Sequence, residues 1–200
     1  VYKQKYEGLY CESCEVFYTE KETSLGASGP ECLVHKQPLK TVSEENYFFK
    51  LSKYEDQLKK LLKERPDFLQ PENRRNEIAA FIEQGLKDFS VSRTNFTWGI
   101  SLPFDPKHII YVWYDALINY LSAVQYASND EMFKKYWPAD VHVIGKDITR
   151  FHTVYWPAML WSAGIELPKK VWAHGFINFN GEKMSKTRGN IITPDEVMKD

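Results

Sequence analysis

Between residues 108 and 179, apolar β-rich runs alternate with segments whose apolar residues recur at helical spacing. The runs "HIIYVWY" (108–114), "DVHVIG" (140–145) and "KVWAHGFINF" (170–179) predict strands, and residues 116–124 and 148–163 predict helices between them. Parallel strands need such crossover helices. We therefore expect an α/β fold with a parallel sheet.

The ends of these strands carry residues that suit a ligand site. Asp115 and Asp147 each follow a strand and are typical of helix N-caps, and Gly164 is typical of a helix C-terminus. In open parallel sheets, ligands bind beyond the carboxyl ends of the strands. We therefore expect one crevice that gathers Asp115, Gly145, Asp147 and the loop 181–190.

Three regions of different composition predict the domain organisation. Residues 1–45 are polar and predict short strands and turns around the cysteines. Residues 46–90 predict helices, with a break at Pro66 and a second helix over residues 76–86. Residues 91–200 form the α/β part.

Two local signals lie near the end of the sequence. Asn180-Gly181 favours a type I′ hairpin. Thr193, Pro194 and Glu196 stand at the N-cap, first and third positions of a capping box, so a helix is expected to begin there. Because few residues come after this helix start, we expect the chain to be an internal part of a longer protein.

The charge and the N-terminal residues exclude several protein classes. The formal net charge is −1, so contact with nucleic acid would need a local basic patch. No apolar run is long enough to span a membrane, and residues 1–11 lack the apolar region of a signal peptide. The three cysteines are an odd number, which favours a reducing compartment. We expect a cytoplasmic protein, with an organellar matrix as the alternative.

The cysteines have the spacing of a structural zinc site. Cys11-x-x-Cys14 and Cys32-x-x-His35 are two close pairs, and together they offer four soft ligands for a tetrahedral ion. Four protein ligands would close the site, so its role would be structural. A redox pair at Cys11 and Cys14, or free cysteines with a surface histidine, are the alternatives.

The segment "GKDITRFHTVYW" combines backbone access with an aromatic face. Gly145 allows a ligand to approach the backbone, and Asp147 can accept hydrogen bonds from ribose hydroxyls or an amine. Ile148, His152 and Trp156 share one helical face. A capped helix with an aromatic core face explains the same pattern, and that alternative also applies to Trp113 and Tyr120.

The loop "GEKMSKTRGN" carries mobile positive charge beside a strand end. Lys183 and Lys186 flank Met184 and Ser185, and such lysines suit a polyphosphate. A glycine-rich loop between strand and helix does not precede them, which disfavours a P-loop mechanism. A solvated charged loop remains the alternative.

These blocks together resemble a known family. "KMSKT" is similar to the Lys-Met-Ser-Lys-Ser signature of class I aminoacyl-tRNA synthetases. "VWYDALINY", "IGKDITRFH", "YWPAML" and "AHGFINFNGEKMSKTRGN" resemble the methionyl-tRNA synthetases over essentially the whole chain. The cysteine pairs and "NYFFKLSKY" are similar to the zinc-bearing connective peptide of the bacterial and organellar enzymes.

The resemblance implies an activity and a fold. L-Methionine and ATP with Mg²⁺ would form methionyl-adenylate, and the amino acid would then pass to tRNA(Met). The fold would be the second half of a Rossmann-type parallel sheet with a small zinc-knuckle insertion and connecting helices.

The resemblance also implies roles for individual residues. Lys183 and Lys186 would stabilise the departing pyrophosphate. The expected ATP contacts are Gly145, Asp147, His174, Ile177 and Lys186. The expected methionine contacts are Trp113, Ala116, Tyr120, Ile148 and His152, with Phe151 and Trp156 rearranging around them. The expected zinc ligands are Cys11, Cys14, Cys32 and His35.

The sequence departs from the family pattern in two places. Thr187 replaces the final serine of the signature and keeps its hydroxyl. The second family signature, His-Ile-Gly-His, is absent, so the isolated chain is expected to lack useful activity. Another class I synthetase and a zinc-stabilised module without catalysis are the alternative functions.

Overall fold

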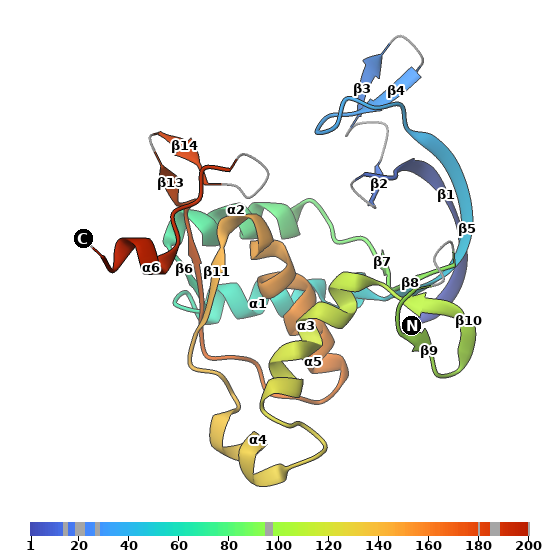
Figure 1. The fold of residues 1–200 in the computed structure, drawn as a ribbon. Coiled ribbons are helices and arrows are strands. Elements are labelled where there is room, and N and C mark those ends of the chain that lie inside the picture. Colours follow the sequence, from blue (N-terminus) through green and yellow to red (C-terminus); the bar gives the residue numbers. More distant parts are fainter. Residues whose placement is uncertain are drawn as a thin grey trace. The chain divides into compact units, whose positions relative to one another are not determined.

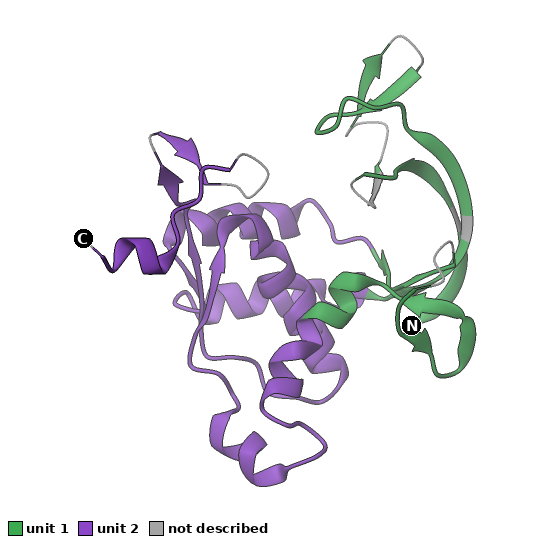
Figure 2. Ribbon diagram, viewed as in Figure 1, with its two compact units in different colours: residues 1–50, 88–116 green, residues 51–87, 117–200 purple. Residues whose placement is uncertain are grey.

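The computed structural model describes all residues except 14–15, 19–22, 27–28, 95–97, 180, 185–188 and 200, and at residues 6, 16, 17 and 44 it describes only the backbone. The chain forms two compact units (Figure 2). Unit 1 comprises residues 1–50 and 88–116, and unit 2 comprises residues 51–87 and 117–200. Figure 1 labels the helices and strands of both units.

Unit 1 is built from antiparallel strands. Strands β1 (Tyr2–Cys11) and β5 (Lys40–Phe49) pair along nearly their whole length. In the same sheet, β2 (Val16–Tyr18) lies beside β1, and β7 (Phe89–Ser90) lies beside β5. A separate two-stranded ribbon is formed by β3 (Thr23–Gly26) and β4 (Gly29–Cys32). The prediction of only short strands was therefore wrong for β1 and β5. Both are rich in polar residues and lack the alternation that marks a half-buried strand.

A second antiparallel sheet in unit 1 corrects the prediction for residues 108–114. Its order is β8 (Ser92–Arg93), β10 (Asp105–Ile110), β9 (Ser101–Leu102). The strand ends at Ile110, and helix α3 (Val112–Ala123) begins at once. The run "HIIYVWY" is thus half antiparallel strand and half helix, because a short apolar run does not distinguish the two.

The first turn of α3 explains why Asp115 is not an N-cap. The backbone N–H groups of Tyr114 and Asp115 donate to the Tyr111 carbonyl over 2.9 and 3.2 Å. The helix is therefore already closed ahead of Asp115, which lies in its first turn. Since β10 belongs to an antiparallel sheet of unit 1, Asp115 does not follow a parallel strand, and this expectation was wrong.

A buried polar network joins the strands of unit 1. The backbone N–H of Tyr47 donates to Ser92 Oγ over 2.9 Å, so the Ser92 hydroxyl is free to donate to His108 Nδ1, 3.1 Å away. His108 Nε2 then faces Asp105 Oδ2 at 3.5 Å, and the Tyr47 hydroxyl also donates to Asp105. Ser92 and His108 are buried. The network satisfies polar groups that would be costly to bury alone.

Unit 2 contains most of the helices. They are η2 (Leu51–Tyr54), α1 (Glu55–Glu64), α2 (Glu72–Glu83), the later part of α3, α4 (Asp130–Tyr136), the 3-10 turn η3 (Lys146–Ile148), the π-helical turn η4 (Phe151–Tyr155), α5 (Trp156–Ser162) and α6 (Pro194–Val197). Helix α1 buries Leu58, Leu61 and Leu62 at the expected helical spacing. Residues 46–49 belong to β5 rather than to a helix, and the second helix begins four residues earlier than predicted.

A small parallel sheet forms the centre of unit 2. Strand β12 (Val171–His174) pairs in parallel with β11 (His142–Gly145) on one side and with β6 (Leu69–Gln70) on the other. The parallel pairing predicted for the second and third runs is confirmed. The third member is β6 instead of residues 108–114, so the fold is a mixed α/β arrangement with antiparallel sheets beside a short parallel one.

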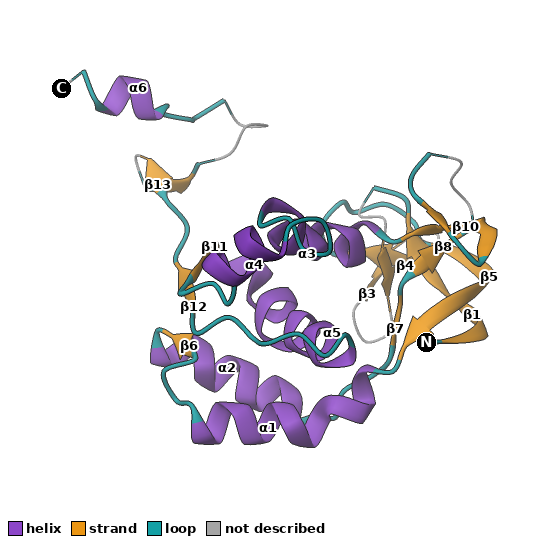
Figure 3. Ribbon diagram, turned by 90° about the horizontal axis from the view of Figure 1, so that it is seen from below, coloured by secondary structure: helices purple, strands orange, loops and turns teal. Residues whose placement is uncertain are grey.

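Helix α5 lies between the α1–α2 pair and α3 in unit 2 (Figure 3). Its Trp161 ring stacks on Tyr54 of η2, and Trp156 approaches Tyr120 of α3. Residues 156–160 are buried without exception. The helix expected over residues 148–163 is therefore present, but it is divided into 3-10, π and α segments and ends at Gly164 with a positive φ of 69°.

The expected hairpin and the expected helix start near the C-terminus are both present, whereas the predicted type I′ turn includes Asn180, which lies outside the described residues. Strands β13 (Asn178–Phe179) and β14 (Glu182–Lys183) form an antiparallel hairpin. The capping box of Thr193 and Glu196 is present in both directions at the start of α6. Within the described ranges, no helix has the length and apolar character that crossing a bilayer requires.

Truncating a buried leucine of unit 2 should destabilise the protein much more than truncating an exposed leucine. Leu58 is fully buried, and Leu25 is 91% exposed. We expect Leu58→Ala to lower the free energy of unfolding by about 2–5 kcal/mol, because it removes buried methyl groups and leaves a cavity. Leu25→Ala is the matched control and should change it by less than about 0.5 kcal/mol. Chemical denaturation measures both, and equal effects would contradict the described core.

Candidate functional site

The carboxyl ends of β11 and β12 lie side by side. Gly145 is the register partner of His174, and Asp147 follows two residues later in η3. A Cβ at position 145 would lie 2.7 Å from Asp147 Oδ1, so a side chain there would displace this carboxylate. Asp147 is not an N-cap, since Gly145 holds that position and η3 begins at Lys146. Ile177 lies beyond β12 and is exposed.

Around His142, the first residue of β11, packs a group of rings that we call the aromatic–histidine cluster. Its members are Tyr120, Trp137, His142, His152 and Trp156. The rings of Tyr120 and His142 have centroids 4.1 Å apart, and the rings of His142 and His152 are 6.1 Å apart. Both histidines are buried. The cluster places two titratable rings in an almost dry aromatic environment.

Hydrogen bonds fix the tautomer of His152. Its Nδ1 lies 3.0 Å from the Ile148 carbonyl, which can only accept, so Nδ1 carries the proton. Nε2 is therefore an acceptor, and the Tyr120 hydroxyl donates to it over 2.9 Å. The result is a directed chain from the Tyr120 hydroxyl through a neutral His152 to the Ile148 carbonyl.

Burial keeps both histidines neutral. Desolvation, and in second place repulsion by a charge on His152, lowers the pKa of His142 from 6.5 to about 4. Desolvation also lowers the pKa of His152, although its bond to the Ile148 carbonyl opposes the change. Burial raises the pKa of the Tyr120 hydroxyl. All three side chains are therefore uncharged near neutral pH.

Polar atoms without a protein partner remain in the cluster. Both ring nitrogens of His142 and Nε1 of Trp156 are buried without a hydrogen-bond partner in the described part of the chain. Such groups are rare, and they concentrate where packing serves a purpose other than stability. Trp156 follows the π-helical turn η4, a feature that is frequent at functional sites.

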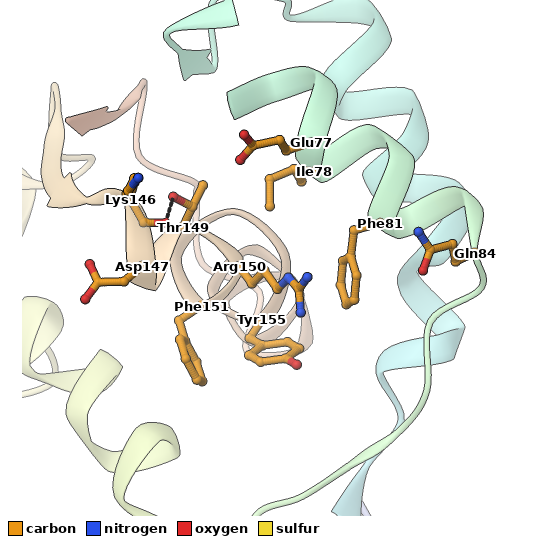
Figure 4. A pocket seen from close by; sticks show the side chains of 10 residues that line it. All are labelled: Glu77, Ile78, Phe81, Gln84, Lys146, Asp147, Thr149, Arg150, Phe151 and Tyr155. Carbon is orange, nitrogen blue, oxygen red and sulfur yellow. Dashed lines mark hydrogen bonds between the residues drawn. The ribbon is translucent and has the colours of Figure 1, made fainter. Parts of the chain in front are cut away.

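A pocket of about 620 Å³ opens beside Asp147 (Figure 4). One wall comes from α2 and the other from residues 146–155. The lining residues are Glu77, Ile78, Phe81, Gln84, Lys146, Asp147, Thr149, Arg150, Phe151 and Tyr155. The pocket thus combines aromatic rings, two cations and two carboxylates next to the strand ends.

The structure brings some of the expected residues together. Tyr120, Ile148 and His152 are joined by the hydrogen-bond chain in unit 2. Trp113 and Ala116 lie in the part of α3 that belongs to unit 1. Lys183 is exposed on β14 with its Nζ 3.5 Å from the Phe176 ring centroid. Lys186 lies outside the described residues.

Three of the four expected zinc ligands also lie together. The Sγ atoms of Cys11 and Cys32 are each 3.9 Å from His35 Nδ1, and all three candidate ligand atoms lie within 4.8 Å of one another. Both cysteines are buried. Cys14 lies outside the described residues. The three described side chains thus converge on one point of unit 1.

Sequence reasoning missed His142 of the aromatic–histidine cluster, and Phe81 and Arg150 of the adjoining pocket. The signal for His142 was a lone histidine inside the apolar run "DVHVIG", where an ionisable side chain is unusual. Phe81 was assigned to the buried side of a helix. It is half-buried, and the Arg150 guanidinium lies 4.3 Å from its ring centroid. No sequence pattern links these two residues, which are far apart in the chain.

Comparison with known proteins gives consistent results. The family described as tRNA synthetases class I (M) matches residues 1–200. The methionine–tRNA ligase of Caldanaerobacter subterraneus subsp. tengcongensis is 55% identical over 199 residues, which are 99% of this chain and 31% of that protein. The methionine–tRNA ligase of Thermotoga maritima is 56% identical over 97% of this chain and 31% of its own length. The chain therefore spans about a third of these relatives.

A solved structure is similar over the same extent. The Mycobacterium tuberculosis methionyl-tRNA synthetase bound by methionyl-adenylate superimposes with a TM-score of 0.87 at 47% identity. The match covers 99% of this chain and 39% of that one.

The buried His142 predicts a pH dependence of stability. Because its pKa is lower in the folded state, the unfolded chain binds more protons between pH 6.5 and about 4, and stability falls as the pH decreases through this window. Across this window, His142 lowers the free energy of unfolding by about 3 kcal/mol. We expect His142→Phe to flatten the dependence and His174→Phe, at an exposed histidine, to leave it unchanged. Urea denaturation at several pH values measures this, and a wild-type dependence in His142→Phe would contradict it.

Proposed function

Because the chain belongs to the family of class I methionyl-tRNA synthetases, we propose that it forms part of the catalytic region of a methionine–tRNA ligase. The substrates of the whole protein would be L-methionine, ATP with Mg²⁺ and tRNA(Met). The proposed location is the cytoplasm or an organellar matrix, where aminoacyl-tRNA is used. Another class I synthetase and a binding module without catalysis are less favoured, because the similar proteins are methionine–tRNA ligases.

One observation carries the proposal. The aromatic–histidine cluster, the carboxyl ends of β11 and β12 and the loop of Lys183 occur in a chain that superimposes on a synthetase bound by methionyl-adenylate. An adenylate joins an apolar thioether to a nucleotide. A site for it therefore needs an aromatic part and a polar part next to each other.

The aromatic part suits methionine. The protons of Tyr120 and of His152 Nδ1 are already engaged, so this wall offers ring surface rather than free donors. A polarisable thioether packs favourably against aromatic rings. Ile148 would also contact the thioether, and Phe151 and Trp156 would rearrange when methionine enters. The indole N–H of Trp156 has no hydrogen-bond partner among the described residues, so such a movement would break no hydrogen bond with them. Trp113 and Ala116 remain methionine contacts that the resemblance implies.

The polar part suits ATP. The exposed Asp147 carboxylate can accept hydrogen bonds from ribose hydroxyls. Because Gly145 has no side chain, this carboxylate can occupy the space next to it. His174 and Ile177 would border the adenosine from β12 and the residues after it. The polyphosphate would meet Lys183 and Lys186.

The proposed chemistry has two steps. In the first, a carboxylate oxygen of methionine bonds to the α-phosphorus of ATP, and the bond to the departing pyrophosphate breaks. Lys183 and Lys186 offset the charge that develops on pyrophosphate. In the second, a terminal ribose hydroxyl oxygen of the tRNA attacks the methionyl carbonyl carbon, its proton is released, and AMP departs.

We also propose a structural zinc ion held by Cys11, Cys14, Cys32 and His35. Tetrahedral zinc with sulfur and nitrogen ligands separates the ligand atoms by roughly 3.5–3.8 Å. The distances of 3.9 Å from each described Sγ to His35 Nδ1 are slightly longer than that separation, so a small inward movement of these side chains would bring them to it. When bound, the ion would supply folding free energy to the ribbon β3–β4 and its neighbours, because unit 1 offers few other buried side chains there.

The loop lysines predict a defect in activation. In the complete enzyme that contains this chain, we expect Lys183→Gln and Lys186→Gln each to lower methionine-dependent ATP–pyrophosphate exchange about 100-fold, because transition-state charge stabilisation is lost. Lys87→Gln, at an exposed lysine between α2 and β7, is the control. Exchange at the wild-type rate in both loop variants would contradict the proposed role of the loop.

The cysteine site predicts a measurable metal content. We expect about one zinc ion per chain by inductively coupled plasma mass spectrometry, and loss of that ion in Cys32→Ala and His35→Ala. Thermal denaturation should show a lower midpoint for unit 1 in these variants and after chelation. Leu33→Ala changes an exposed neighbour and should retain both the metal and the midpoint. Metal-free wild-type protein, purified without chelator, would reject the zinc proposal.

A further inference from the structure

Part of the pocket in Figure 4 has no role in the proposed function. Its α2 wall carries Phe81 and Gln84, and Arg150 faces this wall from the segment that comes after η3. The Arg150 guanidinium lies 4.3 Å from the Phe81 ring centroid, and the Tyr155 ring lies nearby, edge-on to Phe151. Nucleic-acid bases stack on such aromatic rings and guanidinium planes.

The charges of the pocket favour a phosphate group. Glu77 is ion-paired with Arg74, which stands outside the lining. The remaining charged lining residues are Lys146, Asp147 and Arg150, so cations outnumber carboxylates. Neither Lys146 nor Arg150 forms an ion pair among the described residues. A ligand with one phosphodiester would balance this excess.

The pocket is distinct from the expected adenosine contacts of ATP. Of those residues only Asp147 lines it, whereas Gly145, His174 and Ile177 do not. Of the residues proposed around the methionine side chain, Phe151 borders it, whereas Tyr120, Ile148 and His152 do not. Its volume of about 620 Å³ lies within the range of small-ligand sites, so a nucleotide fits.

The second step of the proposed reaction requires a nucleotide next to the adenylate. Since Asp147 is expected at the adenylate and also borders the pocket, the pocket begins where that step would occur. We propose that the Phe81–Arg150 side of this pocket binds the 3′-terminal nucleotide of the tRNA during transfer. The base would stack against the Arg150–Phe81 pair, and Lys146 and Arg150 would hold its phosphodiester. This inference rests on the proposed function.

The two half-reactions test the inference. In the complete enzyme that contains this chain, Phe81→Ala and Arg150→Gln should each lower kcat/KM for tRNA charging by about 5- to 150-fold, the effect of losing one base stack. Methionine-dependent ATP–pyrophosphate exchange should stay within about twofold of wild type. Arg150→Lys keeps the charge but loses the planar group and should give an intermediate loss. Retained exchange shows at the same time that each variant is folded.

Two matched controls lie outside the pocket. Arg75→Gln removes a cation from the same helix, and Tyr136→Ala removes an exposed aromatic ring of unit 2. Both should charge tRNA at the wild-type rate. If the two pocket variants do so as well, the inference is wrong. If their exchange falls in parallel with charging, the pocket serves activation instead, and the inference is also wrong.

A binding experiment separates the two sources of a nucleotide. The single-stranded RNA 5′-ACCA-3′ should bind at least fivefold more weakly to Phe81→Ala than to wild type, whereas AMP should bind both equally. The reverse pattern would assign the pocket to the free nucleotide and overturn the inference. Absence of methionine-dependent exchange in the wild-type enzyme would instead reject the proposed function itself.

Discussion

The parallel pairing of β11 with β12 is the constraint on which the candidate site depends. Because both strands run in the same direction and stay in register to their last residues, Gly145 and His174 end at one edge. The chain then turns through η3, which presents Asp147, and continues into η4 and α5. The segments that leave these two strand ends position the rest of the site in unit 2.

The aromatic–histidine cluster gives the dry part of the candidate site its chemical character. Two buried histidines within 6.1 Å would repel each other if charged, but desolvation holds both pKa values low. The Tyr120–His152–Ile148 chain then uses the neutral tautomer to orient two rings. Uncharged, oriented rings suit an apolar thioether, while the exposed carboxylate and the cations next to them suit a nucleotide. An adenylate needs both kinds of surface, because its thioether is apolar and its nucleotide is polar.

The sequence predicts those parts of the fold that have a local cause. The runs around Ile144 and Val171 are β-rich, apolar and bounded by turn signals, and the capping box at Thr193 is a local hydrogen-bond pattern, so both were found. The start of α3 was misplaced because an apolar run of seven residues fits a strand or a helix. The third parallel strand, Leu69–Gln70, is too short to leave a periodic signal.

Tertiary contacts account for most of the features that the sequence did not predict. The lowered pKa of His142 and the contact of Arg150 with Phe81 both depend on neighbours distant in the chain. The family motifs identified candidate site residues without any knowledge of these tertiary contacts. The spatial arrangement of those residues could not be predicted from the motifs. Resemblance thus identified candidate residues, and packing supplied the physical reasons for their chemistry.

The most direct test of the central claim is a crystal structure of the complete enzyme containing this chain with a non-hydrolysable methionyl-adenylate analogue. The account predicts the thioether in van der Waals contact with the rings of Tyr120 and His152, and a ribose hydroxyl within hydrogen-bond distance of Asp147. A thioether bound away from the aromatic–histidine cluster, or a ribose remote from the ends of β11 and β12, would contradict it.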